Sequence, residues 1–321
     1  MSNLQNNISI DQLPGIFRIE TINSAPTNNG YKTEYRAELY NEKISLSVSF
    51  CCSHPDIRLK ANKLVSIRWK LPLISIDGVI QISRLVLLEH AIKGFNLFET
   101  IPPTWVKDRD LVRRAQIIMD SLPDDMQHLI TAVLWDGIRF HHFCDRPASM
   151  NNHHACQNGN LRHTVEVAEA VMVLAEKYEQ ANLGISLAAA ILHDVGKAAE
   201  YSHWSYGWAM TDRGKLVGHR HTVIEWIAQA MVTNRIMMPE KHYLSLLHAL
   251  TAAPNAERLG IRNPSTPEAT ILSMADRLSG ESALTTQLAK QNGGWGSLHP
   301  HRKWKYFTIP QELNQRNIKG E

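Results

Sequence analysis

The chain has 321 residues, of which 44% are hydrophobic and 20% charged, and its formal net charge is +3. This composition excludes a long disordered chain, and the small net charge gives no overall sign of a nucleic-acid protein, although local clusters can still bind one. The apolar runs are shorter than the ~20 residues of a membrane span, and the polar first residues lack a signal-peptide core, so we expect a cytoplasmic protein without a membrane partner.

Two residue types give further bounds. The four cysteines show no CxxC spacing, and Cys51 and Cys52 are adjacent, so we expect reduced, structural cysteines rather than a disulfide framework. Sixteen histidines stand out, because histidine is the commonest metal ligand and a frequent proton carrier. Where these histidines cluster therefore decides the functional interpretation.

The segment from residue 31 to 89 predicts short β-strands. It contains YRAELY, ISLSVSF, LVSIRWKL and VIQISRLVLL, separated by turn formers such as Asn41, Pro72 and the pair Asp77-Gly78. There is no helix long enough to cover an open sheet. Four to five short strands of this kind favour a small barrel such as an OB-fold, with an SH3-like barrel as the competing shape.

After Pro103 the pattern changes to helix. The segments DRDLVRRAQIIMDSL and PDDMQHLITAVLWDGIRFHHF have apolar residues three and four apart, and helical patterns continue to about residue 290. We therefore expect an α+β multidomain chain, in which a small β-barrel precedes an all-α domain. The predicted parts are an OB-fold-like barrel over 1–90, a helical connector over 91–145, an all-α domain over 146–290 and a basic, aromatic tail over 291–321.

Two helices of the all-α domain carry metal-ligand side chains near an end. On RHTVEVAEAVMVLAEKY, His163 lies on the apolar face, whereas Glu166 and Glu169 belong to a stripe that we expect to face solvent. The next helix, in SLAAAILHDVGK, ends in His193 and Asp194. Gly196 follows directly, and we expect it to end this helix in a left-handed conformation.

A third helix, in STPEATILSMADRLSG, is predicted from its start signals. Ser265 or Thr266 is the N-cap, Pro267 lies in the first turn, and Glu268 is available to complete a capping box. Asp276 then falls on the apolar face of the helix. Three helices thus each direct a ligand-type side chain toward the core.

A metal ion explains these side chains together better than separately. One inward histidine is usually a hydrogen-bonded core residue, but a buried carboxylate without compensation costs several kcal/mol. The set His163, His193, Asp194 and Asp276 suits manganese, iron or magnesium in an open site better than structural zinc. Such an ion activates water and neutralises a phosphate oxygen, which predicts phosphoester hydrolysis. Lys197 is then either a phosphate ligand or a solvated lysine at a helix end.

Four blocks of the sequence carry a resemblance: FCDRPASMNNHHACQNGNLRHTVEVAEAV, ILHDVGKAAEY, MTDRGKLVGHRH and NPSTPEATILSMADRLSG. Their H...HD...D signature resembles the HD-domain phosphohydrolase superfamily. In this order after a small β-barrel, from about residue 15 to 280, they resemble the YhaM-like 3′ to 5′ exoribonucleases, which join an OB-fold to an HD domain. The resemblance implies metal-dependent exonuclease action on single-stranded RNA or DNA and a homo-oligomer. Mn²⁺ is the implied ion, with Mg²⁺, Fe²⁺ or Ni²⁺ as alternatives.

The resemblance also assigns roles by motif match. It implies that His163, His193, Asp194 and Asp276 hold one ion, and that His193, Asp194 and Lys197 form the catalytic group. His154 and His219 are implied to lie near the site. The family usually has a His-His-Gly motif upstream of the last helix, where this chain reads HALTAAPNAERLG. One ion is therefore expected, and a second would have to use His219, His248 or His154.

Several basic and aromatic residues are candidates for substrate binding. Arg220 and His221 are expected to face the phosphate backbone. On the barrel, Lys60, Arg68 and Trp69 supply the basic and aromatic mixture that holds single strands, with an ordinary solvated surface as the alternative. The loop HWSYGW either stacks a base or anchors itself by burial, and the tail HPHRKWKYF either lines a substrate path or straps the domain.

The sequence thus favours a metal-dependent phosphodiesterase, with three rivals. Within the same superfamily, the PAS...HH...H block and HTVEVAEA also resemble HD-containing relaxase-like proteins of conjugative elements. A hydrolase of free nucleotides is the second rival, although such an enzyme needs no barrel to hold a strand. The third is a nucleic-acid-binding or conjugation accessory protein with a weakened HD site, which the missing His-His-Gly favours.

Overall fold

The computed structural model describes residues 10–27, 31–150, 154–290, 292–298 and 303–309. Its strands are β1 (Phe17–Pro26), β2 (Thr33–Asn41), β3 (Ile44–Cys52), β4 (Leu64–Ile76), β5 (Val79–Leu87), β6 (Tyr201–Trp204), β7 (Gly207–Met210), β8 (Gly294–Leu298) and β9 (Lys305–Thr308). Its helices are α1 (Arg109–Asp120), α2 (Asp124–Val133), α3 (Gly137–Asp145), α4 (Gly159–Lys177), α5 (Leu183–Leu192), α6 (Lys197–Glu200), α7 (Asp212–Leu216), α8 (Gly218–Asn234), α9 (Glu240–Thr251) and α10 (Pro267–Leu288).

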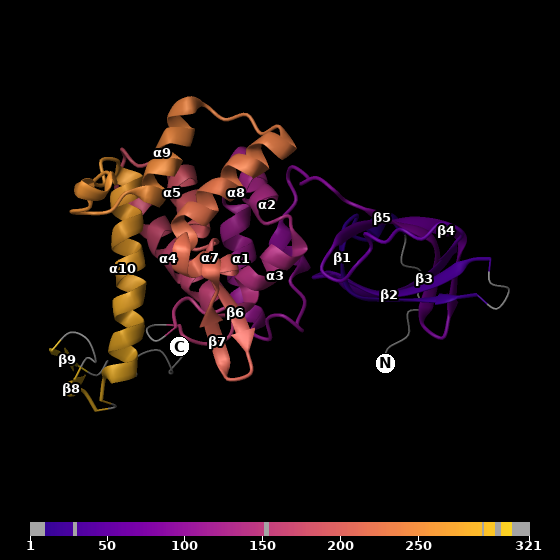
Figure 1. Cartoon of the computed structure of the whole chain (residues 1–321), viewed down its shortest axis with the longest axis horizontal. Coiled ribbons are helices and arrows are strands. Elements are labelled where there is room, and N and C mark those ends of the chain that lie inside the picture. Colours follow the sequence, from indigo (N-terminus) through magenta and orange to yellow (C-terminus); the bar gives the residue numbers. More distant parts are fainter. Residues whose placement is uncertain (1–9, 28–30, 151–153, 291, 299–302, 310–321) are drawn as a thin grey trace, which may run out of the picture.

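The first five strands form a sheet at one end of the elongated molecule (Figure 1). They pair in the order β1-β2-β3-β5-β4, and β1 returns to β4 through Phe17 and Val65, so that the sheet closes. β3 and β5 run parallel, whereas the other neighbours are antiparallel. Phe17, Ile19, Val48 and Val65 are fully buried inside. The expectation of a β-unit before a helical region is therefore confirmed.

Two details of this sheet differ from the prediction. β1 lies before the predicted segment, and its first three residues are all buried, so it lacks the alternation that marks a strand. Pro72 was expected to mark a turn but lies inside β4, where the pairing with β5 shifts between Trp69 and Ile74. Proline is tolerated at such an irregularity because the ladder hydrogen bond is already lost there.

The helices form a second core that is built around α4 and α5. Every residue of α5 from Gly184 to Leu192 is buried, which explains its continuous run of small and aliphatic side chains. α4 contacts α1, α3, α5 and α10. The predicted helix over 123–143 is divided, because the side chain of Asp136 accepts hydrogen bonds from the backbone N–H groups of Ile138 and Arg139 and starts α3 there. Thr266 caps α10 as predicted, through the backbone N–H of Ala269.

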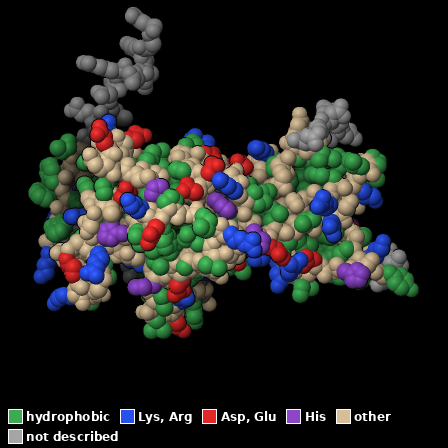
Figure 2. Space-filling model, turned by 90° about the horizontal axis from the view of Figure 1, so that it is seen from above, with side chains coloured by type: hydrophobic (Ala, Val, Ile, Leu, Met, Phe, Trp, Pro, Cys, Tyr) green, Lys and Arg blue, Asp and Glu red, His purple; other side chains and the backbone are tan. Residues whose placement is uncertain are grey.

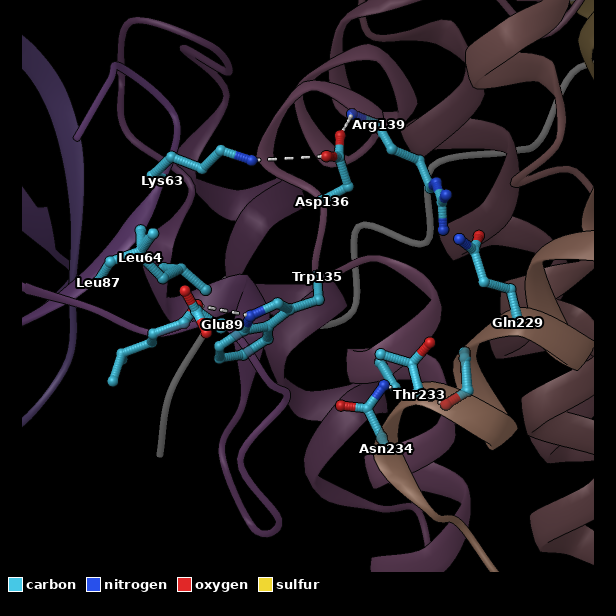
Figure 3. A pocket seen from close by; sticks show the side chains of 13 residues that line it. Lys63, Leu64, Leu87, Glu89, Trp135, Asp136, Arg139, Gln229, Thr233 and Asn234 are labelled. Carbon is cyan, nitrogen blue, oxygen red and sulfur yellow. Dashed lines mark hydrogen bonds and ion pairs between the residues drawn. The ribbon is translucent and has the colours of Figure 1, made fainter. Parts of the chain in front are cut away.

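The sheet and the helices meet at a polar junction around a hollow of about 350 Å³ (Figure 3). Lys63 and Asp136 form an ion pair across it at 3.6 Å, and the indole of Trp135 donates to the carbonyl of Leu88 at 3.0 Å. Beside it, Arg18 of β1 is only 1% exposed. These contacts fix the sheet directly onto the helical unit.

Two hairpins lie where the sequence suggested irregular chain. β6 and β7 pair in the aromatic segment after the His-Asp pair, and β8 pairs with β9 in the tail. Figure 1 shows β8 and β9 at one end of α10, on the side of the molecule away from the sheet. In the part of the chain that the structure describes, no helix has both the length and the apolar character needed to cross a membrane. All four cysteines are unpaired.

Candidate metal centre

Three helices bring four ligand side chains together. His163 lies in the second turn of α4, His193 and Asp194 directly follow α5, and Asp276 lies in the middle of α10. The Nε2 atoms of His163 and His193 are 3.3 Å apart, and both are 3.4 Å from Oδ2 of Asp194. Oδ1 of Asp276 is 3.1 Å from Nε2 of His163 and 4.0 Å from that of His193. The predicted four-residue set therefore meets in space.

For His163, His193 and Asp194 these separations fit ligands around a single divalent ion, and Asp276 lies beside this group. Nitrogen and oxygen ligands bind such ions at about 2.1 Å, so neighbouring donor atoms of an octahedral site are about 3.0 Å apart and opposite ones about 4.2 Å. The donor-atom distances given above span 3.1 to 4.0 Å. His163, His193 and Asp194 form the tightest group, while Asp276 is the most accessible member, with 44% of its side chain exposed. The buried carboxylate of the site is therefore Asp194 rather than Asp276.

Hydrogen bonds on the far side of each ring orient both histidines. Nδ1 of His193 lies 2.7 Å from the carbonyl oxygen of Ala190, to which it donates a proton. Nδ1 of His163 lies 3.1 Å from Oγ of Ser279. A donor at Nδ1 leaves a lone pair on Nε2, which is the form that binds a metal. Both Nε2 atoms are thus presented to the centre of the site.

Ser279 in turn links His163 to a carboxylate. Its hydroxyl donates to Oε2 of Glu166 at 2.9 Å, and the same oxygen is 2.9 Å from Nε2 of His154. The expectation that Glu166 faces solvent is therefore wrong, because α10 covers that part of α4. Partners of this kind fix ring orientation and raise the basicity of a ligand. Ser279 and Glu166 were both absent from the predicted site.

Lys197 contacts the site rather than solvent. Its ammonium group is 2.5 Å from Oδ2 of Asp194, and only 12% of its side chain is exposed. Burial alone would raise the pKa of Asp194, but Lys197 and His193 outweigh it and hold that pKa well below its ordinary value. Burial likewise opposes ionisation of Asp276, yet His163 keeps the pKa of Asp276 lowered. Both carboxylates are consequently ionised at neutral pH.

The two histidines respond differently to the same surroundings. Burial lowers the pKa of His163 and outweighs the hydrogen bond from Asp276, which acts in the opposite direction. Burial would also lower the pKa of His193, but the adjacent charge of Asp194 overcomes it and the pKa is raised. His163 is therefore held in the neutral form that a ligand needs.

Gly196 is needed for a close approach rather than for a turn. Its φ is −60°, so the expectation of a left-handed residue is wrong, and α6 follows at once. A Cβ atom at this position would lie 2.1 Å from the carbonyl oxygen of His219. The backbone of α8 thus packs directly against the turn that carries the His-Asp pair.

The three histidines proposed for a second ion lie in different surroundings. Nε2 of His219 is 3.5 Å from Oδ1 of Asp194, and its Nδ1 is 3.2 Å from Glu200. The ring of His154 is 5.9 Å from that of His163. Nε2 of His248 instead accepts a hydrogen bond from the backbone N–H of Ser265 at 2.9 Å. The structure therefore brings His219 and His154 to the site and occupies His248 elsewhere.

A hollow of about 80 Å³ opens beside the site. His193, Asp194, His219, Arg220 and Asp276 form its polar wall, and the remainder is formed by small apolar residues such as Ala253 and Leu272. Arg220 thus lies where a phosphate could be bound. His221 is exposed and does not line the hollow.

The barrel residues proposed for substrate binding do not belong to this hollow. Lys60 and Arg68 are exposed and Trp69 is half-buried. Arg68 lies directly opposite Arg84 in the pairing of β4 with β5. In the aromatic hairpin, Trp204 and Tyr206 are 66% and 103% exposed, which does not fit the alternative of a buried anchor for these two side chains.

Two further residues support the site without a signal in the sequence. The side-chain amide of Asn160 donates to the backbone carbonyl of Asp194 at 3.3 Å, and Asn160 is fully buried. Glu200 is 7% exposed and accepts from the backbone N–H of His219.

Glu268 was expected to complete a capping box, but its carboxylate accepts hydrogen bonds from the backbone of Asn182 and the hydroxyl of Ser245.

The helices that build this centre lie in a stretch that matches a known domain family. Residues 160–281 match the family described as HD domain, and this stretch contains all four side chains of the predicted metal set. The predicted resemblance to the HD-domain superfamily is confirmed for this stretch of the chain.

The chain also matches curated relatives, over 149 residues. The chain is 26% identical over 149 residues to the 3′-5′ exoribonuclease YhaM of Listeria welshimeri and 27% identical to that of Listeria monocytogenes. Each match covers 46% of this chain and 47% of the relative, so the chain spans about half the length of the curated relatives that it matches. No solved structure matches the chain. The predicted resemblance to YhaM-like exoribonucleases is thus confirmed as a similarity.

Proposed function

We propose that the protein is a metal-dependent phosphodiesterase that removes nucleotides from the 3′ end of single-stranded RNA or DNA. The convergence of two imidazole and two carboxylate groups from three helices of an HD domain carries this proposal. The similarity to proteins named 3′-5′ exoribonuclease supports the direction and the substrate class. Mn²⁺ is the ion that we expect, held by His163, His193, Asp194 and Asp276.

The residues of the chain prepare the site for this reaction. A divalent ion, when bound, supplies a Lewis acid for the phosphate and lowers the pKa of water. Ser279 and the carbonyl of Ala190 hold the two imidazoles in the ligating form. Lys197 keeps Asp194 ionised and in place. Arg220, which lines the hollow beside the site, binds a phosphate of the strand.

The sheet is proposed to be an OB-fold that holds the strand. Its closed order, with parallel β3 and β5 and a return of β4 to β1, supports this assignment over the SH3-like alternative. Lys60, Arg68 and Trp69 are the proposed contacts, through phosphates and stacked bases. The face seen in Figure 2 mixes Lys and Arg with Asp and Glu, so binding there must depend on local groups rather than on one charged surface.

The same proposal includes domain limits at residues 90, 145 and 290, a cytoplasmic location and a homo-oligomer. A second ion near His219 and His154 is not part of this proposal. The third side chain predicted to hold it, His248, already accepts a hydrogen bond from the backbone N–H of Ser265. The chain's own residues at the site account for one ion.

The test is a cleavage assay with the full chain. Single-stranded RNA and DNA labelled at the 5′ end are incubated with Mn²⁺, beside a His193→Ala, Asp194→Ala double variant. We expect a ladder that shortens from the 3′ end and is lost in the variant. Tight strand binding by the wild type without cleavage would instead identify an accessory protein. Hydrolysis of free nucleotides but not of strands would identify a nucleotide hydrolase.

A further inference from the structure

The β8–β9 hairpin presents an aromatic and basic outer face. Trp295 and Phe307 pair across the two strands, with ring centroids 5.3 Å apart and planes at 69°. They are 60% and 58% exposed, respectively. Lys305, two residues before Phe307, is also exposed and lies opposite Leu298. Large aromatic side chains are seldom left in water without a reason, so this face is a candidate interaction surface.

The opposite face of the hairpin is fixed to α10. Gly296 is buried, and a Cβ atom there would lie 2.2 Å from the carbonyl oxygen of Leu288, so β8 touches the end of the helix with its backbone. In β9, the hydroxyl of Tyr306 donates to the carboxylate of Glu281. The alternation of β9 then directs Tyr306 toward the helix and Lys305 and Phe307 away from it.

This attachment places the hairpin on the same helix as Asp276, toward the C-terminal end of that helix. Glu281 follows Asp276 by five residues on α10. At 1.5 Å and 100° per residue, the anchor of Tyr306 lies about 7.5 Å along the helix axis and about 140° around it from the carboxylate of Asp276. One rigid helix therefore connects the catalytic group to the aromatic face.

We propose that this outer face is a docking surface for single-stranded nucleic acid whose 3′ end lies in the metal centre. The proposal rests on the proposed function and adds a second strand contact to it, distinct from the barrel. Aromatic rings stack on any base, and lysines bind the phosphates between them, which suits a nuclease without sequence preference.

Charge favours a nucleic acid over a second copy of the chain. No aspartate or glutamate occurs between Lys290 and Ile309, whereas Lys303 and Lys305 lie in the described part of the hairpin. Two copies that met through this face would bring like charges together, at a cost in free energy. A polyanion is the complementary partner.

The experiment compares two double variants of the full chain. Lys305→Gln, Phe307→Ala removes a cation and a ring from the outer face but retains Tyr306. Lys177→Gln, Tyr178→Ala makes the same chemical change in an exposed pair at the far end of α4. Binding of 5′-labelled oligo(U) and oligo(dT) is measured by fluorescence anisotropy with EDTA present, and hydrolysis of bis(p-nitrophenyl) phosphate is measured with Mn²⁺.

We expect the hairpin variant to bind both oligonucleotides about tenfold more weakly, while the α4 variant binds as the wild type does. Both variants should hydrolyse the small diester at the wild-type rate, because neither touches the metal centre. Equal strand affinities of wild type and hairpin variant, with strand cleavage intact, would overturn the docking surface and leave the proposed function standing. A wild type that neither binds nor cleaves strands would refute the proposed function itself. Loss of self-association in the hairpin variant would assign the face to a second copy and overturn the proposal.

Discussion

Two buried charges in this molecule are compensated in different ways. Arg18 at the junction is 1% exposed, and Asp194 in the metal centre is 3% exposed. Arg18 donates to the carbonyl oxygens of Thr100 and Asn62 and to the hydroxyl of Thr100, and its guanidinium lies over the rings of Trp105 and Phe140. Its neighbours are neutral hydrogen-bond acceptors and aromatic faces.

The carboxylate of Asp194 is surrounded instead by several cationic or metal-binding side chains. Lys197 and three histidines approach its carboxylate, while two imidazole nitrogens face each other at 3.3 Å. Ligand atoms whose lone pairs face one another repel, and they stabilise the fold only when a cation binds between them. A buried charge whose hydrogen bonds are all made with neutral partners thus contributes to packing. A cluster of ligand atoms that face one point is instead arranged for binding.

The largest effect is expected for Asp194→Asn at the metal centre, where the loss of metal binding and the loss of stability can be measured separately. Asp194→Asn should reduce phosphodiester hydrolysis by on the order of 10³-fold, since it removes a ligand and its charge. It should also destabilise the fold by about 3 kcal/mol, because Lys197 then lies buried without a carboxylate. Calorimetric Mn²⁺ binding and thermal unfolding measure the two effects.

The matched control for this change is the double variant Asp194→Asn, Lys197→Met. Removing the stranded ammonium should restore most of the stability and none of the Mn²⁺ binding. A single variant that still binds Mn²⁺ with wild-type affinity would contradict the assignment of Asp194 as a ligand.

The second prediction concerns the junction. Arg18→Ala should lower the free energy of unfolding by about 3 kcal/mol, because it opens a cavity and leaves the oxygens of Thr100 and Asn62 without a donor. Hydrolysis of a small diester by the folded fraction and Mn²⁺ affinity should stay unchanged. Arg113→Ala, at an exposed position on α1, is the control and should alter none of these. A loss of Mn²⁺ affinity in Arg18→Ala would break the distinction between the two regions.

The third prediction sharpens the role of Ser279. Ser279→Ala removes the hydrogen-bond partner of His163 and should weaken Mn²⁺ binding by about 10- to 100-fold, as is usual for groups that orient a ligand. Thr286→Ala, whose hydroxyl donates to the carbonyl of Ser282 within α10, is the control. Calorimetry with Mn²⁺ decides the matter, and an unchanged affinity in Ser279→Ala would reduce the serine to a packing role.

The smallest effect is expected at Asp136, in the junction of Figure 3. Asp136→Ala removes the N-cap of α3 and should cost about 1 kcal/mol at neutral pH. Burial opposes ionisation of Asp136, but the backbone N–H of Arg139 and the charge of Lys63 outweigh it and lower its pKa. The carboxylate therefore stabilises the fold fully above the ordinary pKa of 3.8, and this stabilisation is lost as the pH falls through the lower folded-state value.

The measurement is the difference in unfolding free energy between wild type and Asp136→Ala at several pH values. The difference should shrink at the acidic end. A constant difference across the whole range would mean that the cap acts through its shape alone.

The sequence predicted the four side chains that the structure brings together at α4, α5 and α10, because each carries a local signal. His193 and Asp194 are adjacent at a helix end, and His163 and Asp276 fall on or beside apolar helix faces, so periodicity alone located them. The helical region and the β-unit were predicted for the same reason. A small barrel was expected from the number of short strands, whereas the individual strand pairs were not predicted, because they depend on which edges meet.

The supporting residues depend on contacts between distant segments. Glu166 looked solvent-facing because a helical pattern describes one helix only, and Ser279 reaches it from 113 residues away. The partner of His248 is a backbone N–H of a loop, which no residue type announces. The role of Gly196 was misjudged because glycine serves both left-handed turns and close contacts, and only the position of α8 distinguishes them.

The pairing of Arg68 with Arg84 on adjacent strands has a consequence for the barrel. Like charges directly opposite each other destabilise a strand pair, and in the described part of the chain neither arginine has an ion pair with a carboxylate. The folded sheet therefore holds a repulsion that an anion between the two guanidinium groups would relieve. Because both arginines are exposed, added salt screens this repulsion, so the sheet is expected to gain stability as the ionic strength rises.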